Sequence, residues 1–285
     1  MSKSTHFIGH PLLGQLLSLI DQVDVHRISK KHGGEHYVKH FDAWHHLVTM
    51  LYAIIMRFDS LREIQLSMTA ESRKLSHLGL TKIPKRSTLS DANVRRSEVI
   101  FGELYATLYD KHKGVLSSDS RNRGSTPSWL RKLKIMDSTT ISLFSNLVFK
   151  GVGRNPKRGK KKLISLLTND FEMPQQDIID IYRKRWMIET LFKQLKQNFP
   201  LRYFYGESAN AIKIQVWCTL IANLLLMLIK RSVRRSWSFS GLATMIRILM
   251  MYYVNYKSIL EYPEKDWDLM IEEVIRPPNH LSLFD

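Results

Sequence analysis

The sequence predicts an α/β protein in which a helical N-terminal region precedes a region that contains strands. In the first 125 residues, apolar side chains recur at the three- and four-residue spacing of an amphipathic helix. After residue 126, segments rich in β-branched and apolar residues alternate with helical patterns. We therefore expect two domains, at residues 1–125 and 126–285, separated near the polar segment GVLSSDSRNRGSTP.

Composition narrows the class of function. The 285 residues are 44% apolar, enough for a core, and 43 Lys and Arg against 26 Asp and Glu give a net charge of +17. This charge favours a polyanion such as nucleic acid as the partner. The single cysteine, Cys218, excludes an intrachain disulfide and a thiolate zinc cage, and suits the cytoplasm. We expect no signal peptide, and the apolar segment at 216–229 is too short to span a bilayer comfortably, so a buried helix and no membrane association are expected.

Three helices are predicted before residue 70. Residues 12–20 carry apolar side chains at helical spacing, and a second helix is expected over 42–58, where Asp42 can cap the start. The segment DSLREIQLSM then predicts a short helix that begins at its first or second residue, with Glu63 placed for a capping box.

A further helix is expected after Pro84, capped by Ser87 and carrying Arg95 and Arg96 before an apolar run. A short helix, a basic turn and a helix in this order are typical of a helix-turn-helix. The residue types that contact phosphates or base edges are Ser87, Thr88, Ser90 and Asn93. The pattern predicts a DNA-reading helix with Arg95 and Arg96 as DNA contacts, and an ordinary helical hairpin is the alternative.

Five histidines lie close together in the sequence: His32, His36, His40, His45 and His46. His36 and His40 are four residues apart, which would suit a metal if the segment were helical. The neighbouring Gly33 and Gly34 and the lack of a third ligand favour solvated surface histidines.

The first predicted strand lies in WLRKLKIMDSTTISLF, where Thr139 and Thr140 stand among apolar residues. Asp137 interrupts it. A carboxylate in a buried strand is costly unless it is paired, hydrogen-bonded or metal-bound, which makes Asp137 a candidate site residue. The alternative is an acidic residue at the end or on the exposed face of the strand.

A strongly basic run follows this strand. GRNPKRGKKK holds six cations in ten residues, and LISLLTNDF after it predicts a buried strand. Such runs are usually solvated loops. In this basic protein, Arg158 and Lys160 are also expected to hold a phosphate backbone.

The segment YRKRWMIETLFKQLK predicts an amphipathic helix with a polar face suited to phosphoryl chemistry. Tyr182, Arg185, Glu189 and Lys196 project within about 60° of one another if the segment is helical. The carboxylate of Glu189 could ligate a divalent metal, and Arg185 and Lys196 could contact phosphate oxygens. A surface helix with solvated charges is the alternative.

The spacing of these four residues carries a family resemblance. Tyr, two residues, Arg, three residues, Glu, six residues and Lys is complete here, and MDSTT and LLTNDF accompany it. The sequence resembles bacterial insertion-sequence transposases with the YREK signature, the DDE enzymes typified by insertion sequence four. The resemblance implies an RNase-H-like core in which Asp137 and Glu189 ligate Mg²⁺ or Mn²⁺ for strand cleavage and transfer. It also implies that Tyr182, Arg185 and Lys196 contact double-stranded DNA at the terminal inverted repeats, with a homodimer as one expected assembly.

The sequence departs from this family in one respect. Such enzymes use three carboxylates, and the second Asp precedes the signature helix on a central strand, whereas only 52 positions separate Asp137 from Glu189 here. We therefore expect an internal deletion near 162/163 that leaves the core without its central strands and impairs catalysis. The alternative function is a non-catalytic DNA-binding product that occupies element ends.

Overall fold

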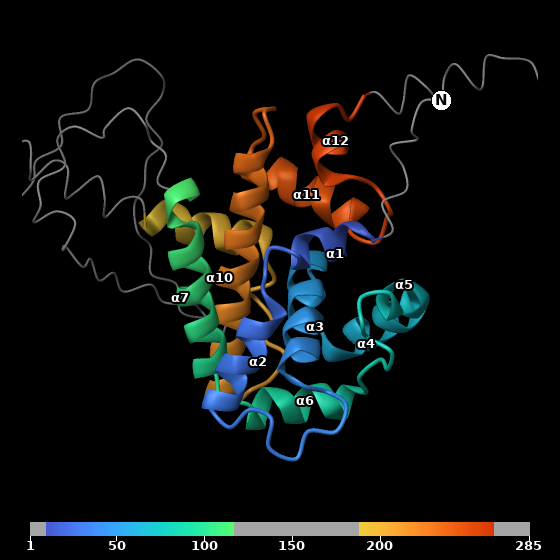
Figure 1. Ribbon diagram of the computed structural model, residues 1–285, viewed down its shortest axis with the longest axis vertical. Helices are drawn as coiled ribbons and strands as arrows, with labels where there is room; N and C mark the ends of the chain where they lie inside the picture. The colour runs from blue at the N-terminus through green and yellow to red at the C-terminus, as the bar shows by residue number, and fades with distance from the viewer. Residues whose placement is uncertain (1–9, 117–187, 265–285) are drawn as a thin grey trace, which may run out of the picture. The chain divides into compact units, whose positions relative to one another are not determined.

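Helices alone form the described part of this protein. The structure is a computed structural model, and it describes residues 10–116 and 188–264. Every regular element in these ranges is a helix (Figure 1). The predicted α/β fold class is therefore wrong for the described residues, because their core is built by helices packed on helices, with no sheet between them. The two predicted strands, at 129–144 and 163–171, lie outside the described residues.

The chain divides into two compact units. Among the described residues, the first unit comprises 10–116 and 204–264, and the second comprises 188–203. The predicted division at 125/126 had placed residues 204–264 in the other domain. In the structure these residues pack with the N-terminal helices, because they supply the central helix of that unit.

Ten helices form the described part of the first unit (Figure 1). They are α1 (Leu12–Leu17), α2 (Gln22–Lys31), α3 (Ala43–Met56), α4 (Leu61–Ala70), α5 (Ser72–Ser76), α6 (Arg86–Arg95), α7 (Val99–Leu116), α10 (Ala209–Ser232), α11 (Phe239–Leu249) and α12 (Tyr256–Glu261). The second unit contains a helix over residues 188–198.

The core of the first unit is centred on α10 and α3. Figure 1 shows α10 running beside α7 and α3, with α6 across one end and α11 and α12 at the other. Of the described helices, α10 is the one that is long and apolar enough to cross a membrane by length and composition, but 61% of its most apolar window is buried inside the protein. The prediction of a buried helix here is confirmed.

Local capping signals locate the starts of α3 and α4. The Asp42 carboxylate accepts a hydrogen bond from the backbone N–H of His45 at 2.8 Å, as predicted. At α4, the Ser60 hydroxyl accepts from the Glu63 N–H at 3.3 Å, and the Glu63 carboxylate accepts from the Asp59 N–H at 3.0 Å. The Ser60 half of the predicted capping box is confirmed, whereas the Glu63 carboxylate bonds the N–H one residue before the cap.

The start of α6 is set by a neighbouring helix. Lys85 precedes the helix and Ser87 lies within its first turn, so the predicted cap at Ser87 is wrong. The N–H of Arg86 donates to the side-chain oxygen of Gln65 on α4 at 3.0 Å. An acceptor from another element therefore takes the role of a local cap.

Candidate nucleic-acid interface

Buried and partly buried polar contacts hold α6 against α10 and α3. The side-chain amide of Asn210, at the start of α10, donates to the carbonyl oxygens of Asn93 and Arg96, both at 2.8 Å. His46 on α3 lies 2.8 Å from the side-chain oxygen of Asn93, which is buried. These bonds fix the inner face of α6, so its opposite face is presented in a defined orientation.

The outer face of α6 carries four exposed side chains: Ser87, Asp91, Val94 and Arg95. Val94 is 56% exposed, although it is apolar. A hydroxyl, a carboxylate, an apolar side chain and a guanidinium are the groups that contact base edges in a DNA groove.

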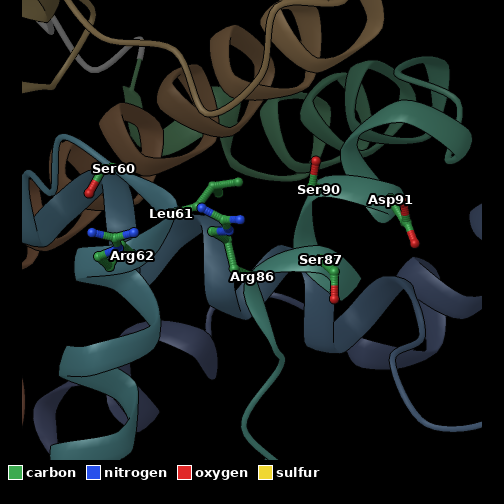
Figure 2. Close-up of a pocket in the computed structure, with 7 residues that line it drawn as sticks. All are labelled: Ser60, Leu61, Arg62, Arg86, Ser87, Ser90 and Asp91. Atoms are coloured by element: carbon green, nitrogen blue, oxygen red, sulfur yellow. The ribbon is translucent and has the colours of Figure 1, made fainter.

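A pocket of about 630 Å³ lies where the starts of α4 and α6 meet (Figure 2). Figure 2 shows Arg86 extending from the start of α6 towards Leu61 at the start of α4, and Arg62 near Ser60 on α4. The described lining residues are Ser60, Leu61, Arg62, Arg86, Ser87, Ser90 and Asp91. We name this pocket the arginine hollow.

The arginine hollow suits an anion. Arg62 and Arg86 are exposed, and neither forms an ion pair with a carboxylate in the part of the chain that the structure describes. The hollow also lies at the starts, and so the positive ends, of two helices, and the side chain of Lys85 does not cap α6. Two cations, hydroxyl groups and helix starts are the contacts that proteins make with DNA phosphates.

A second pocket, of about 760 Å³, lies between α6, the loop at 33–41 and the segment at 82–85. We name it the loop hollow. Its cationic lining residues are Lys39, Lys82, Lys85, Arg95 and Arg96. Asp91 is the one acidic residue in the described lining of either hollow. Both sides of α6 are therefore strongly positive.

The two arginines that are predicted to contact DNA at the end of α6 differ in their exposure to solvent. Arg95 is exposed and lines the loop hollow. Arg96 is only 5% exposed, and its Nε and Nη2 donate to the carbonyl oxygens of Gly34 at 3.3 Å and Phe41 at 2.9 Å. Arg96 thus supports the loop from inside the protein.

The histidines of this region have different environments. His36 and His40 are exposed and line the loop hollow, and the Lys82 ammonium lies 3.4 Å from Nε2 of His40. The prediction that the five histidines lie at the surface is wrong for His46, which is fully buried. Burial, followed by the charge of Arg96, lowers the pKa of His46 to about 3. In His45 the pKa is raised, chiefly by its hydrogen bond to Asp42.

Two of the predicted catalytic-region residues fall within the described chain. Glu189 and Lys196 line one pocket of about 350 Å³ on the helix at 188–198, together with Lys193, so they share a helix face as their spacing predicts. Lys193 and Lys196 place positive charge beside the carboxylate. The remaining predicted site residues, outside the described residues, are Asp137, Arg158, Lys160, Tyr182 and Arg185.

The described residues do not by themselves fit the expected metal ion. They contain no group of three or more His, Cys, Asp and Glu side chains that could hold one. Two lysines beside Glu189 suit a phosphate better than a divalent cation. Metal binding by Asp137 and Glu189 therefore stays a prediction.

Segments of the chain are similar to known proteins. Residues 8–81, which include α1 to α5, match a family model described as a domain of unknown function, DUF4372. A protein of Sinorhizobium fredii named as a transposase is 35% identical over 105 residues, which cover 34% of this chain and 28% of that protein. No solved structure matches the chain significantly.

Two further relatives are named for insertion sequences. The transposase named for element IS4SA of Synechocystis is 43% identical over 54 residues, covering 19% of this chain and 16% of the relative. The one named for element IS5377 of Geobacillus stearothermophilus is 33% identical over 63 residues, covering 22% and 17%. Each match spans less than a third of the relative's length. Over these segments the chain is similar to proteins named as transposases, two of which are named for insertion sequences.

Proposed function

We propose that this protein has the role of an insertion-sequence transposase, in which it binds double-stranded DNA at the ends of the element. Its similarity to proteins named as transposases and its charge of +17 support the proposal. The observation that carries it is the arginine hollow, where the starts of α4 and α6 bring Arg62 and Arg86 together. Each arginine would donate to a phosphate oxygen.

The test compares binding to a duplex that carries the terminal inverted repeat. In the double variant Arg62→Ala/Arg86→Ala, loss of two phosphate contacts should weaken binding about tenfold and reduce the slope of log K against log salt by about 2. Fluorescence anisotropy over a range of salt concentrations measures both quantities.

A matched control is available at the other end of the first unit. Arg231 is exposed in the last turn of α10, whereas α6 is bonded to the first turn of that helix through Asn210. Asn210 and Arg231 are therefore roughly 32 Å apart along α10, at 1.5 Å per residue. If Arg231→Ala weakened binding as much as the double variant, or if neither changed it, the assignment of the arginine hollow to DNA would be wrong.

Strand cleavage is a separate part of the proposal. It rests on the YREK spacing, in which Glu189 and Lys196 lie on one described helix, and on the resemblance that assigns Mg²⁺ to Asp137 and Glu189. We propose that cleavage is impaired, because 52 positions between these acids leave little room for a third carboxylate on a central strand. A non-catalytic protein that occupies the ends would shift the same duplex and leave both strands intact. Sedimentation of the complex tests the expected homodimer.

A further inference from the structure

The two hollows flank the exposed face of α6. At about 100° per residue, the α6 residues that line the arginine hollow and those that line the loop hollow centre roughly 120° apart around the helix axis. Asp91 lines both hollows, and it points away from Leu89 and Asn93, which face the core. The middle of the exposed face therefore carries a carboxylate, with a cationic hollow on either side.

The loop hollow has a fixed wall. Arg96 ties the loop at two carbonyl oxygens, those of Gly34 and Phe41. A Cβ at Gly34 would lie 2.5 Å from the Ser29 hydroxyl and 2.5 Å from Ile100, so the loop is packed closely on α2 and α7. The concave shape is thus specified by buried contacts.

The buried guanidinium also leaves charge uncompensated at this wall. Nη1 of Arg96 is buried without a hydrogen-bond partner among the described residues, and Arg96 forms no ion pair there. Burial is the main influence on its pKa, which is lowered, while Glu35 and Asp42 act in the opposite direction. An anion in the hollow would stabilise this cation together with Lys39, Lys82 and Lys85.

The dimensions of a helix match those of a DNA groove. A helix with its side chains is about 10–12 Å across, and the major groove is about 12 Å wide with a phosphate backbone on each side. Phosphate-binding hollows on both sides of one helix therefore match both strands at once. Asp91 between them would repel a phosphate, whereas its carboxylate can accept a hydrogen bond from the N4 amino group of cytosine.

We propose that the two hollows hold backbone phosphates of opposite DNA strands, the arginine hollow one strand and the loop hollow the other. This inference rests on the DNA binding proposed above. In this arrangement α6 lies in the major groove, and Asp91 faces the base edges as a specificity-determining residue. Arg96 acts as a positioning residue, since it holds the loop that carries Lys39.

Phosphate-ethylation interference on the element-end duplex tests this arrangement. Wild type should give two clusters of essential phosphates, on opposite strands across one major groove. Lys39→Ala/Lys82→Ala should lose one cluster and Arg62→Ala/Arg86→Ala the other, and each variant should reduce the salt slope by about 2. All four side chains are exposed, and unchanged thermal melting would verify that the variants fold.

A base-substitution series provides a second readout. Asp91→Ala should reduce discrimination at one C·G pair by about tenfold while preserving the salt slope, because Asp91 contacts a base and no phosphate. Equal discrimination in Asp91→Ala and wild type would overturn the assignment of Asp91.

Three results would overturn the inference about the loop hollow. If wild type bound no DNA, both this inference and the proposed function would fail. If Lys39→Ala/Lys82→Ala retained both clusters while Arg62→Ala/Arg86→Ala lost binding, the inference alone would fail. The third result concerns a free phosphate ester. If the protein bound ATP saturably, and Lys39→Ala/Lys82→Ala abolished this binding without changing the affinity for DNA, the loop hollow would be a nucleotide site instead.

Discussion

The side-chain amide of Asn210 donates to the carbonyl oxygen of Arg96 at 2.8 Å and so joins the start of α10 to the end of α6. The same amide bonds the Asn93 carbonyl oxygen, and the Asn210 side-chain oxygen accepts from the backbone N–H of Glu98 at 3.1 Å. One side chain therefore satisfies the last carbonyls of the proposed reading helix and an N–H at the start of α7.

Removal of this side chain should destabilise the first unit. Asn210→Ala leaves partly buried carbonyl groups without their donor, which costs about 2 kcal/mol in the free energy of unfolding. Urea denaturation measures the change. Thr244→Ala, at an exposed position on α11, should lie within about 0.5 kcal/mol of wild type. Equal midpoints for Asn210→Ala and wild type would show that Asn210 does not hold α6.

Buried His46 should make the protein less stable in acid. Its folded pKa is about 3, below the ordinary 6.5, so between these values the unfolded chain binds a proton that the folded chain does not. Stability attributable to His46 is therefore present above pH 6.5 and decreases as the pH falls, by about 2 kcal/mol at pH 5. His46→Gln should remove this dependence, which urea denaturation between pH 5 and about 7.5 measures.

His45 provides a control of opposite sign. Its pKa is raised in the folded state, so its contribution is present below pH 6.5 and is lost as the pH rises through the folded pKa. His45→Gln should therefore steepen the acid destabilisation, whereas His46→Gln should flatten it. The same slope in both variants would contradict the two assigned environments.

The sequence predicts elements whose signals are local. Asp42 and Ser60 lie within three residues of the N–H groups that they cap, so the starts of α3 and α4 can be predicted. The start of α6 cannot be predicted in this way, because the acceptor for its first N–H comes from Gln65 on another helix.

The candidate interface depends on tertiary packing in the same way. Arg62 and Arg86 line one hollow although 24 positions separate them, and no local pattern indicates that their helix starts are neighbours. Arg95 and Arg96 are identical in type and adjacent in sequence, yet one is exposed and the other buried, because the loop at 33–41 covers only Arg96. Helical periodicity identifies the basic region, and packing decides which cations face solvent.

Gly34→Ala should damage the loop hollow. The new methyl group would overlap the Ser29 hydroxyl, which itself donates to Glu35 at 2.6 Å, so the loop must move at a cost of about 1–3 kcal/mol. Gly114→Ala, in the last turns of α7, places the new Cβ where no atom of another described element lies within 4 Å, and it should instead be neutral or stabilising by up to about 1 kcal/mol. Thermal unfolding compares the two, and equal effects would contradict the close packing at Gly34.

Glu189→Gln separates DNA binding from cleavage. Two-metal phosphoryl transfer uses carboxylates to hold two ions about 3.5–4 Å apart, and Glu189 is expected to share this task with Asp137 alone. Wild type should therefore bind end DNA and leave both strands uncut with Mg²⁺ or Mn²⁺. Glu189→Gln should bind the same DNA equally or more tightly, because it removes a negative charge near Lys193 and Lys196. Denaturing gels of end-labelled duplex measure cleavage. Cuts made by wild type and by the exposed-site control Glu207→Gln, but not by Glu189→Gln, would show that catalysis survives and that Glu189 is essential to it.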